Sequence, residues 1–357
     1  MLTSTRTRIL ITALFTTATL TAQQDPMQNP FLALMTAANA HAKAHGAQTP
    51  VLSPVDATLI GPNPSVDVAQ LHKAGFKVVP WTTNDPAKMR SLIDLRVDGI
   101  ISDRPDLLQQ VVAEERAAHP DEAQYFATFD VSAHRGGRGL RPENTLPSFE
   151  DGLDHLSTTL ENRVYTHDIS LTEAQSTFIC DKLHPAFPDQ KNDLALSPVA
   201  VAFAKQEHLI SPYVPTHAEQ LFRFSRFYAE YYRTGPGKSH PDAAARAANA
   251  QKVRFNLETK ILPLPNDPAG KPNPAMTNAH AEPTTNHTVD PQTFVTTLCG
   301  AIVRNHMESQ AEVQSFDFRT LILVEEQFPK IPTYYLTADP KMLSTAFVPA
   351  SLRQPPQ

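Results

Sequence analysis

Cysteine is scarce in this sequence of 357 residues, which contains only Cys180 and Cys299. Two cysteines exclude a disulfide framework and lack metal-ligand spacing, although a single bridge between them stays open. Glycine, at 12 residues, lies below its usual share of about 7%, and no apolar run approaches the roughly 20 residues that span a bilayer. The formal net charge of −6 offers no basic field for a nucleic-acid backbone. We therefore expect a globular protein that has no nucleic-acid partner and no membrane span.

The first 22 residues have the layout of a secretory signal peptide. Arg6 and Arg8 precede an apolar run over 9–15, and a stretch of small residues ends near Ala22. We expect residues 1–22 to be removed and the mature protein to be exported, either to a periplasm or out of the cell. The high proline content, 32 residues, predicts many stiff or irregular connections but does not select a fold.

Short apolar runs alternate with helical patterns along the rest of the chain, which is typical of a parallel sheet with crossover helices. We expect strands over 76–81, 97–103, 129–133, 158–161, 253–258, 312–316 and 332–336. Helices are expected over 27–50, 86–95, 104–116, 146–156, 218–232, 291–306 and 319–327. This pattern favours a TIM-type (β/α)8 barrel with insertions, and a doubly wound sheet is the alternative. Residues 262–290 are expected to form a long surface loop.

The stretch from Ala133 to Thr145 follows a predicted strand and precedes a predicted helix. In a barrel this position is the carboxyl-end rim, where active sites are built. His134 can move protons, Arg135 suits a phosphate, and the glycines allow a close approach of the backbone. A Gly-rich loop with solvated basic residues is the alternative for so short a motif.

The longer pattern resembles the glycerophosphodiester phosphodiesterase family. Its parts are His134-Arg135-Gly136, Pro142-Glu143-Asn144-Thr145, Thr159-Leu160-Glu161, Asn256-Leu257-Glu258-Thr259-Lys260, Val313-Gln314-Ser315-Phe316-Asp317, Pro80-Trp81-Thr82 and Asp98-Gly99-Ile100-Ile101-Ser102-Asp103-Arg104-Pro105. The resemblance implies a TIM-type barrel that hydrolyses glycerophosphodiesters, which are small molecules, to glycerol 3-phosphate and an alcohol with a bound divalent cation.

The order of these parts departs from the family. The tryptophan and Asp-Gly-Ile-Ile segments form the last two strands in the family, but here they come first. This order resembles a circular permutation, which a closed barrel tolerates because its last strand pairs with its first. We expect 27–114 to form the last two βα units, 115–129 a linker, 130–337 the first units, and 338–357 a loose tail. A fused or misassembled reading frame is the alternative.

The second departure concerns the site. The family has Glu-x-Asp where this chain has Glu161 and then Arg163, and the hairpin before the His-Asp pair is shortened to leave His167 and Asp168. The linker is too short for a parallel crossover, so one barrel strand is expected to be missing or displaced. The added positive charge of Arg163 leaves a catalytically impaired, phosphate-binding relative as the alternative to an active enzyme. A phospholipase-type phosphodiesterase is a further alternative.

The resemblance implies a role for each matched residue. Ca²⁺ or Mg²⁺ would bind Glu161 and Glu258, with Asp168 as the replacement third ligand. His134 and His167 would act as acid and base. The remaining matched residues would contact the substrate: Arg135 and Lys260 the phosphate, Trp81 the glycerol moiety, and Glu143 in support of His134 or Arg135.

His41 and His45 stand four residues apart and could share one face of a helix. The sequence places no third ligand near them, so we expect them to be solvent-exposed.

Overall fold

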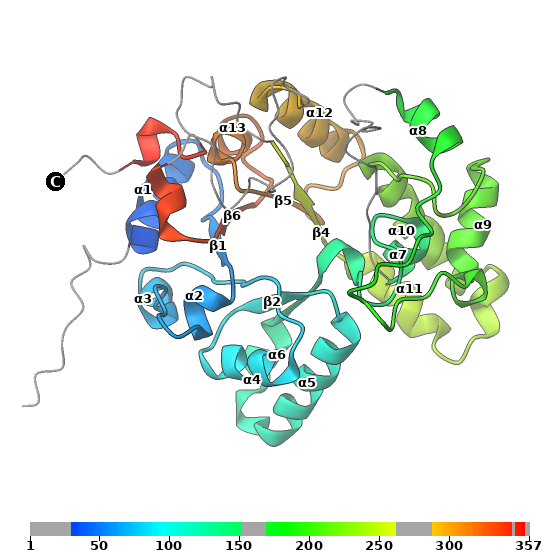
Figure 1. Cartoon of the computed structure of the whole chain (residues 1–357), viewed down its shortest axis with the longest axis horizontal. Coiled ribbons are helices and arrows are strands. Elements are labelled where there is room, and N and C mark those ends of the chain that lie inside the picture. Colours follow the sequence, from blue (N-terminus) through cyan, green and yellow to red (C-terminus); the bar gives the residue numbers. More distant parts are fainter. Residues whose placement is uncertain (1–29, 152–168, 262–287, 345–346, 354–357) are drawn as a thin grey trace, which may run out of the picture.

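The computed structural model describes residues 30–151, 169–261, 288–344 and 347–353, in which strands and helices alternate (Figure 1). The strands are β1 Val51–Pro54, β2 Gly99–Ser102, β3 Asp130–Ala133, β4 Phe255–Glu258, β5 Ala311–Ser315 and β6 Thr333–Thr337. The helices are α1 Pro30–Ala44, α2 Ala57–Ile60, α3 Val68–Lys73, α4 Pro86–Asp94, α5 Pro105–Ala118, α6 Ala123–Thr128, α7 Leu146–Asp151, α8 Leu171–Thr177, α9 Pro198–Gln206, α10 Ala218–Arg233, α11 Ala243–Lys252, α12 Pro291–Arg304 and α13 Phe318–Gln327. The α/β class is as expected.

The paired strands of the molecule are parallel. One sheet has the order β1-β6-β5-β4, and a second sheet joins β2 to β3. The pairing of β2 with β3 brings the Asp-Gly-Ile-Ile segment beside the strand that leads to His134. This is the contact expected if the last strand of the family pattern pairs with the first.

Residues 77–83 connect the two sheets through the backbone. Leu52 donates its N–H to the Lys77 carbonyl at 3.0 Å, and Asp98 donates to the Val78 carbonyl at 2.8 Å. The predicted strand over 76–81 thus lies between β1 and β2, paired at isolated positions. The resulting order of strands is β4-β5-β6-β1-(77–81)-β2-β3. It follows the order of the strands along the chain from a shifted starting point, whereas the strand order of a doubly wound sheet reverses direction partway across.

Closure of this series into a barrel stays a prediction. The open position lies between β3 and β4, and the strand expected there, at 158–161, falls in 152–168, outside the residues that the structure describes. The missing or displaced strand inferred from the sequence concerns the same range. The structure therefore establishes parallel sheets in an order that fits a barrel.

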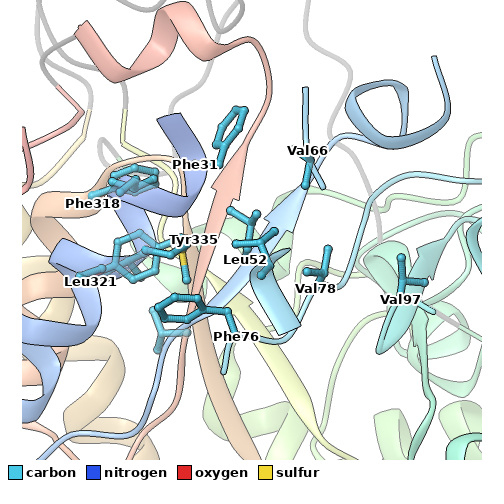
Figure 2. Packing of buried hydrophobic residues seen from close by; sticks show 14 of the residues in the cluster. Phe31, Leu52, Val66, Phe76, Val78, Val97, Phe318, Leu321 and Tyr335 are labelled. Carbon is cyan, nitrogen blue, oxygen red and sulfur yellow. The ribbon is translucent and has the colours of Figure 1, made fainter. Parts of the chain in front are cut away.

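Neighbouring strand residues face two different layers, because successive side chains in a strand point to opposite sides. Val51, Val79, Ile101 and Tyr334 form one buried cluster, with Trp81 packed against it. The adjoining positions in the chain belong to the larger core outside the strands, where Figure 2 shows Leu52, Val78 and Tyr335 with Phe31 of α1 and Leu321 of α13. The strands are thus covered on both sides.

A helical insertion occupies the chain between β3 and β4. Helices α7, α9, α10 and α11 bury a second core that includes Phe203, Phe224 and Tyr232. The pattern over 218–232 predicts α10, whereas α8, α9 and α11 were not expected. Of the long loop expected over 262–290, residues 262–287 lie outside the described part.

Two segments are more ordered than the sequence suggested. Residues 338–353 were expected to be a loose tail, but Phe347, Val348 and Leu352 are buried, and the turn Ala350–Leu352 contacts α1. The apolar residues of this segment are separated by short 3-10 turns and therefore show no helical periodicity. For this reason the sequence contains no sign that the segment is packed. The expected linker over 115–129 contains the end of α5 and all of α6, with Phe126 buried.

Cys180 and Cys299 are both buried, and no disulfide joins these two described residues. Burial raises the pKa of the Cys299 thiol to about 12, so it stays protonated at neutral pH. Among the described helices, none combines the length and apolar character that crossing a membrane requires. The signal peptide expected at 1–22 lies outside the described residues.

Candidate active site

His134 and Asp103 meet at the carboxyl ends of two neighbouring strands. Ala133 of β3 is in register with Ser102 of β2, so the residues that follow each strand leave the sheet side by side. His134 Nδ1 lies 2.6 Å from Asp103 Oδ1. The carboxylate therefore fixes the Nδ1–H tautomer of the imidazole and leaves Nε2 to exchange a proton.

Asp103 is nearly inaccessible, with 3% of its side chain exposed, and it has further partners. Arg138 Nε donates to Oδ1 at 2.7 Å, and Asn84 Nδ2 donates to Oδ2 at 2.8 Å. Burial alone would raise the pKa of Asp103, but His134, Arg138 and Asn84 outweigh it and hold this pKa below its ordinary value. Asp103 is therefore ionised at neutral pH and lies in contact with His134.

The loop after β3 gathers two guanidinium groups on one buried carboxylate. Arg135 and Arg138 both donate to Glu143, with Arg138 at 3.0 Å from Oε2. Arg135 has a left-handed backbone (φ 47), and Gly136 and Gly137 continue the turn at positive φ. A Cβ at Gly139 would lie 2.8 Å from the Asp103 carbonyl, so only glycine fits. This arrangement holds two guanidinium groups, whose charges are balanced by Glu143 and Asp103, close to His134, where guanidinium groups can bind a phosphate.

Glu258 and Lys260 stand at the carboxyl end of β4. Lys260 Nζ is 4.0 Å from Glu258 Oε1, and its side chain is more than half exposed. Between them, Thr259 is buried and bonds the Thr320 hydroxyl at 2.7 Å. Alternation along the strand therefore turns Glu258 and Lys260 to the same side, as the sequence pattern implies.

Trp81 lies at the same end of the parallel series. Its Nε1 donates to the Ser53 carbonyl at 3.0 Å, and its ring meets Phe316 edge to face at 5.3 Å. The next residue, Thr82, places its hydroxyl 3.4 Å from His134 Nδ1. The tryptophan strand is thus directly beside the histidine.

The structure joins His134, Arg135 and Glu143 into one cluster and sets Trp81, Glu258 and Lys260 on other strand ends of the same rim. Glu143 contacts Arg135, one of the two partners that were considered for it. Glu161, His167 and Asp168 lie outside the described residues, so their roles stay predictions.

Sequence reasoning missed Asp103, Arg138 and Asn84. A signal for Asp103 existed, because the permuted order places the end of the 97–103 strand beside the end of the 129–133 strand. Arg138 and Asn84 sit in loops, whose side-chain directions no periodicity encodes.

Of the three predicted metal ligands, the structure describes only Glu258. A hard cation such as Ca²⁺ takes 6–8 oxygen ligands, so this single carboxylate does not make up a site. Asp103, which contacts His134, and Glu143, in the loop that follows this histidine, are both engaged by arginines. The predicted site therefore depends on Glu161 and Asp168.

Comparison with known proteins gives two matches. Residues 3–107 match the model of the Glycerophosphoryl diester phosphodiesterase family, a range that contains Trp81 and Asp103 and ends before His134. A 45-residue stretch is 49% identical to "Probable glycerophosphodiester phosphodiesterase 2" of Mycobacterium tuberculosis (strain ATCC 25618 / H37Rv). That stretch is 13% of this chain and spans only 17% of the relative's length. No solved structure matches the chain significantly.

Proposed function

We propose that this chain, of which residues 3–107 match the model of the Glycerophosphoryl diester phosphodiesterase family, hydrolyses glycerophosphodiesters to glycerol 3-phosphate and an alcohol. The observation that carries the proposal is the His134–Asp103 hydrogen bond, set beside two arginines at the carboxyl end of parallel strands. An oriented imidazole can transfer a proton and fixed guanidinium groups can bind phosphate oxygens, and cleavage of a phosphodiester needs both contributions.

In the proposed reaction, Arg135 and Arg138 hold the phosphate oxygens, and Glu143 keeps both guanidinium groups in place. The oxygen of water, or of the glycerol hydroxyl next to the phosphate, loses its proton and bonds to phosphorus, while the bond from phosphorus to the alcohol oxygen breaks and that oxygen gains a proton. If the glycerol hydroxyl attacks, water then opens the resulting cyclic phosphate to glycerol 3-phosphate. We assign one of the two proton transfers in each step to His134 Nε2 and the other to His167. Trp81 packs against the glycerol moiety and Lys260 adds positive charge.

Bound Ca²⁺ or Mg²⁺ would neutralise charge on the phosphodiester. We propose Glu161, Glu258 and Asp168 as its ligands. Arg163 in place of the family aspartate favours the second candidate, a relative that binds phosphate-bearing ligands without turnover.

The test is release of glycerol 3-phosphate from glycerophosphocholine by the purified protein, with Ca²⁺, with Mg²⁺ and with chelator. We expect metal-dependent release that falls roughly 10²–10⁴-fold in His134→Ala. The matched control is His119→Ala, which removes an exposed histidine that is 3.7 Å from Glu115. This control should keep the wild-type rate.

Other outcomes separate the alternatives. A folded protein that releases nothing but binds the intact diester, measured by calorimetry, supports the non-catalytic candidate. Turnover of sphingomyelin or lysophosphatidylcholine in place of glycerophosphocholine supports the phospholipase type.

We also propose that the protein is exported, because residues 1–22 have a signal-peptide layout. Sequencing the amino terminus of protein recovered from the native host should find a start near residue 23 if the proposal holds.

A further inference from the structure

Two histidines, one in the last turn of α1 and one directly after it, lie against two glutamates of α13, at the end of the strands opposite the candidate active site. His41 and His45 are near the end of α1, which leads into the amino end of β1. Glu325 and Glu326 are near the end of α13, which leads into the amino end of β6. The two helices are in contact (Figure 1), so four candidate ligand residues come together.

Both ring nitrogens of His41 face a carboxylate. Nδ1 lies 3.0 Å from Glu325 Oε2, and Nε2 lies 3.2 Å from Glu326 Oε1. A neutral imidazole donates a hydrogen bond from one nitrogen only. If Nδ1 donates to Glu325, the lone pair of Nε2 faces an oxygen of Glu326, which is also an acceptor. A proton or a metal ion between Nε2 and Glu326 resolves this conflict.

Glu325 fixes the tautomer of His41. Its side chain is 1% exposed, and its other oxygen accepts from the hydroxyls of Thr333 at 2.8 Å and Tyr335 at 3.0 Å. This buried carboxylate is held in place and accepts the Nδ1–H of His41. A carboxylate behind the second nitrogen of a histidine is the usual outer contact of a metal-bound imidazole.

A hydrogen bond also fixes the tautomer of His45. Its Nδ1 lies 3.0 Å from the His41 carbonyl, which accepts the hydrogen and leaves Nε2 with a lone pair. The ligand atoms of His41, His45 and Glu326 all lie within 4.8 Å of one another. Histidines four apart on a helix present both rings on one face.

We propose that His41, His45 and Glu326 bind a divalent transition-metal ion, Zn²⁺ by its ligand preference. Two imidazoles and one carboxylate form a three-ligand zinc set with an open position, whereas Ca²⁺ and Mg²⁺ prefer oxygen ligands. The ion would tie α1, the first described helix, to α13. This site is independent of the proposed hydrolysis. The expectation that both histidines are solvent-exposed without a third ligand nearby is wrong for His41, since only 16% of its side chain is exposed and Glu326 lies 3.2 Å away.

The test uses untagged full-length protein, stripped with chelator and kept in excess Mg²⁺ and Ca²⁺ so that oxygen-ligand sites are occupied. Zn²⁺ is titrated against a chromophoric chelator, and Co²⁺ absorption reports the coordination. We expect one tightly bound Zn²⁺ per chain and a rise in Tm of several degrees, because a ligand that binds only the folded state stabilises it.

Two variants change solvent-accessible ligands, so the fold should survive them. His45→Ala and Glu326→Gln should each weaken Zn²⁺ binding at least 10-fold and abolish the rise in Tm. The matched control, His119→Ala, removes a histidine paired with a carboxylate but without a third ligand, and should bind Zn²⁺ as the wild type does. Undiminished binding in both variants, or none in the wild type, would overturn the proposal and leave a protonated His41 between the glutamates.

Discussion

The anion at Asp103 governs the chemistry of His134 at the residue scale. Its carboxylate is buried, holds a pKa below the ordinary value, and touches both the imidazole and Arg138. An imidazole that gains a proton during a reaction is stabilised by such a fixed charge. Asp103 is therefore a positioning residue that acts through His134.

Replacing Asp103 by Asn removes the charge and keeps the shape of the side chain. If the proposed hydrolysis is correct, we expect kcat to fall about 10²-fold with KM nearly unchanged, because the tautomer and charge of His134 are no longer fixed. The dependence of kcat on pH should shift as well. The control is Asp106→Asn, which breaks the more exposed ion pair with Arg104. A normal pH profile in Asp103→Asn would refute this role.

A second residue-scale prediction concerns Asp130. Burial raises the pKa of Asp130, despite its hydrogen bond from Ser132 and the charge of Arg254. Arg254 also donates a hydrogen bond to Glu312, whose pKa is likewise raised by burial. An acid with a raised folded pKa stabilises the fold below its unfolded pKa of about 3.9, and this advantage is lost as pH rises through the folded value.

Asp130→Asn should remove the decrease in stability that the wild type shows as Asp130 ionises with rising pH. We expect its free energy of unfolding, relative to the wild type, to increase with pH from 4 upward and then level off, as measured by urea denaturation. Asp121→Asn changes an exposed aspartate and should show no such trend. A difference that is independent of pH would contradict the assignment.

The sequence motif groups residues that the structure places close together, but it does not show their partners from other strands and helices. His134, Arg135 and Glu143 stand in one motif, and the structure joins them. The Glu326 ligand of the proposed zinc site is 281 positions from His45, and no local pattern reports such a distance along the chain. Partners across strands or helices become visible only through the topology.

At the element scale, α1 is attached through its apolar face. Phe31, Leu34 and Met35 are at most 3% exposed and belong to the same core cluster as Phe318 and Leu321 of α13, in which Figure 2 shows Phe31, Phe318 and Leu321. The two helices are therefore held in contact by apolar packing that needs no metal ion.

Phe31→Ala should therefore lower the free energy of unfolding by roughly 3–5 kcal/mol, the usual loss for a buried phenylalanine. Chemical denaturation measures this change. Thr36→Ala, on the exposed side of the same helix, should stay within about 0.5 kcal/mol. Equal effects of the two substitutions would show that α1 does not depend on its buried face.

Elements with a clear period or a start signal were predicted well. Asp85 with Pro86 begins α4, and Asp317 caps α13 by accepting the N–H of Arg319. The strand β1 was missed because four residues that end in Pro54 are too few for alternation to be visible. Its strand character comes from pairing with β6, which is a tertiary effect.

At the scale of the whole molecule, the series of strands explains why the family segments can occur in shifted order. Each strand of the series β4-β5-β6-β1-(77–81)-β2-β3 contacts its neighbour, and β2 pairs with β3 across the expected old chain ends. The described ends of the chain lie close together, because α1 contacts the turn Ala350–Leu352. Proximity of the ends is what permits a chain to be rejoined and reopened.

A chain restored to the family order should consequently fold. It would begin at Asp121 and end at Pro120, with a flexible linker replacing residues 354–357 and 1–29. We expect a change in unfolding free energy of no more than about 1–2 kcal/mol, because the entropy of closing a loop grows slowly with its length. Glycerophosphocholine turnover, where the parent has it, should be retained. The control chain opens between Val313 and Gln314, inside β5, and should not fold, since that break interrupts pairing with both β4 and β6. A restored chain that fails in the same way as this control would mean that the present order is required by the fold and is not a permutation of it.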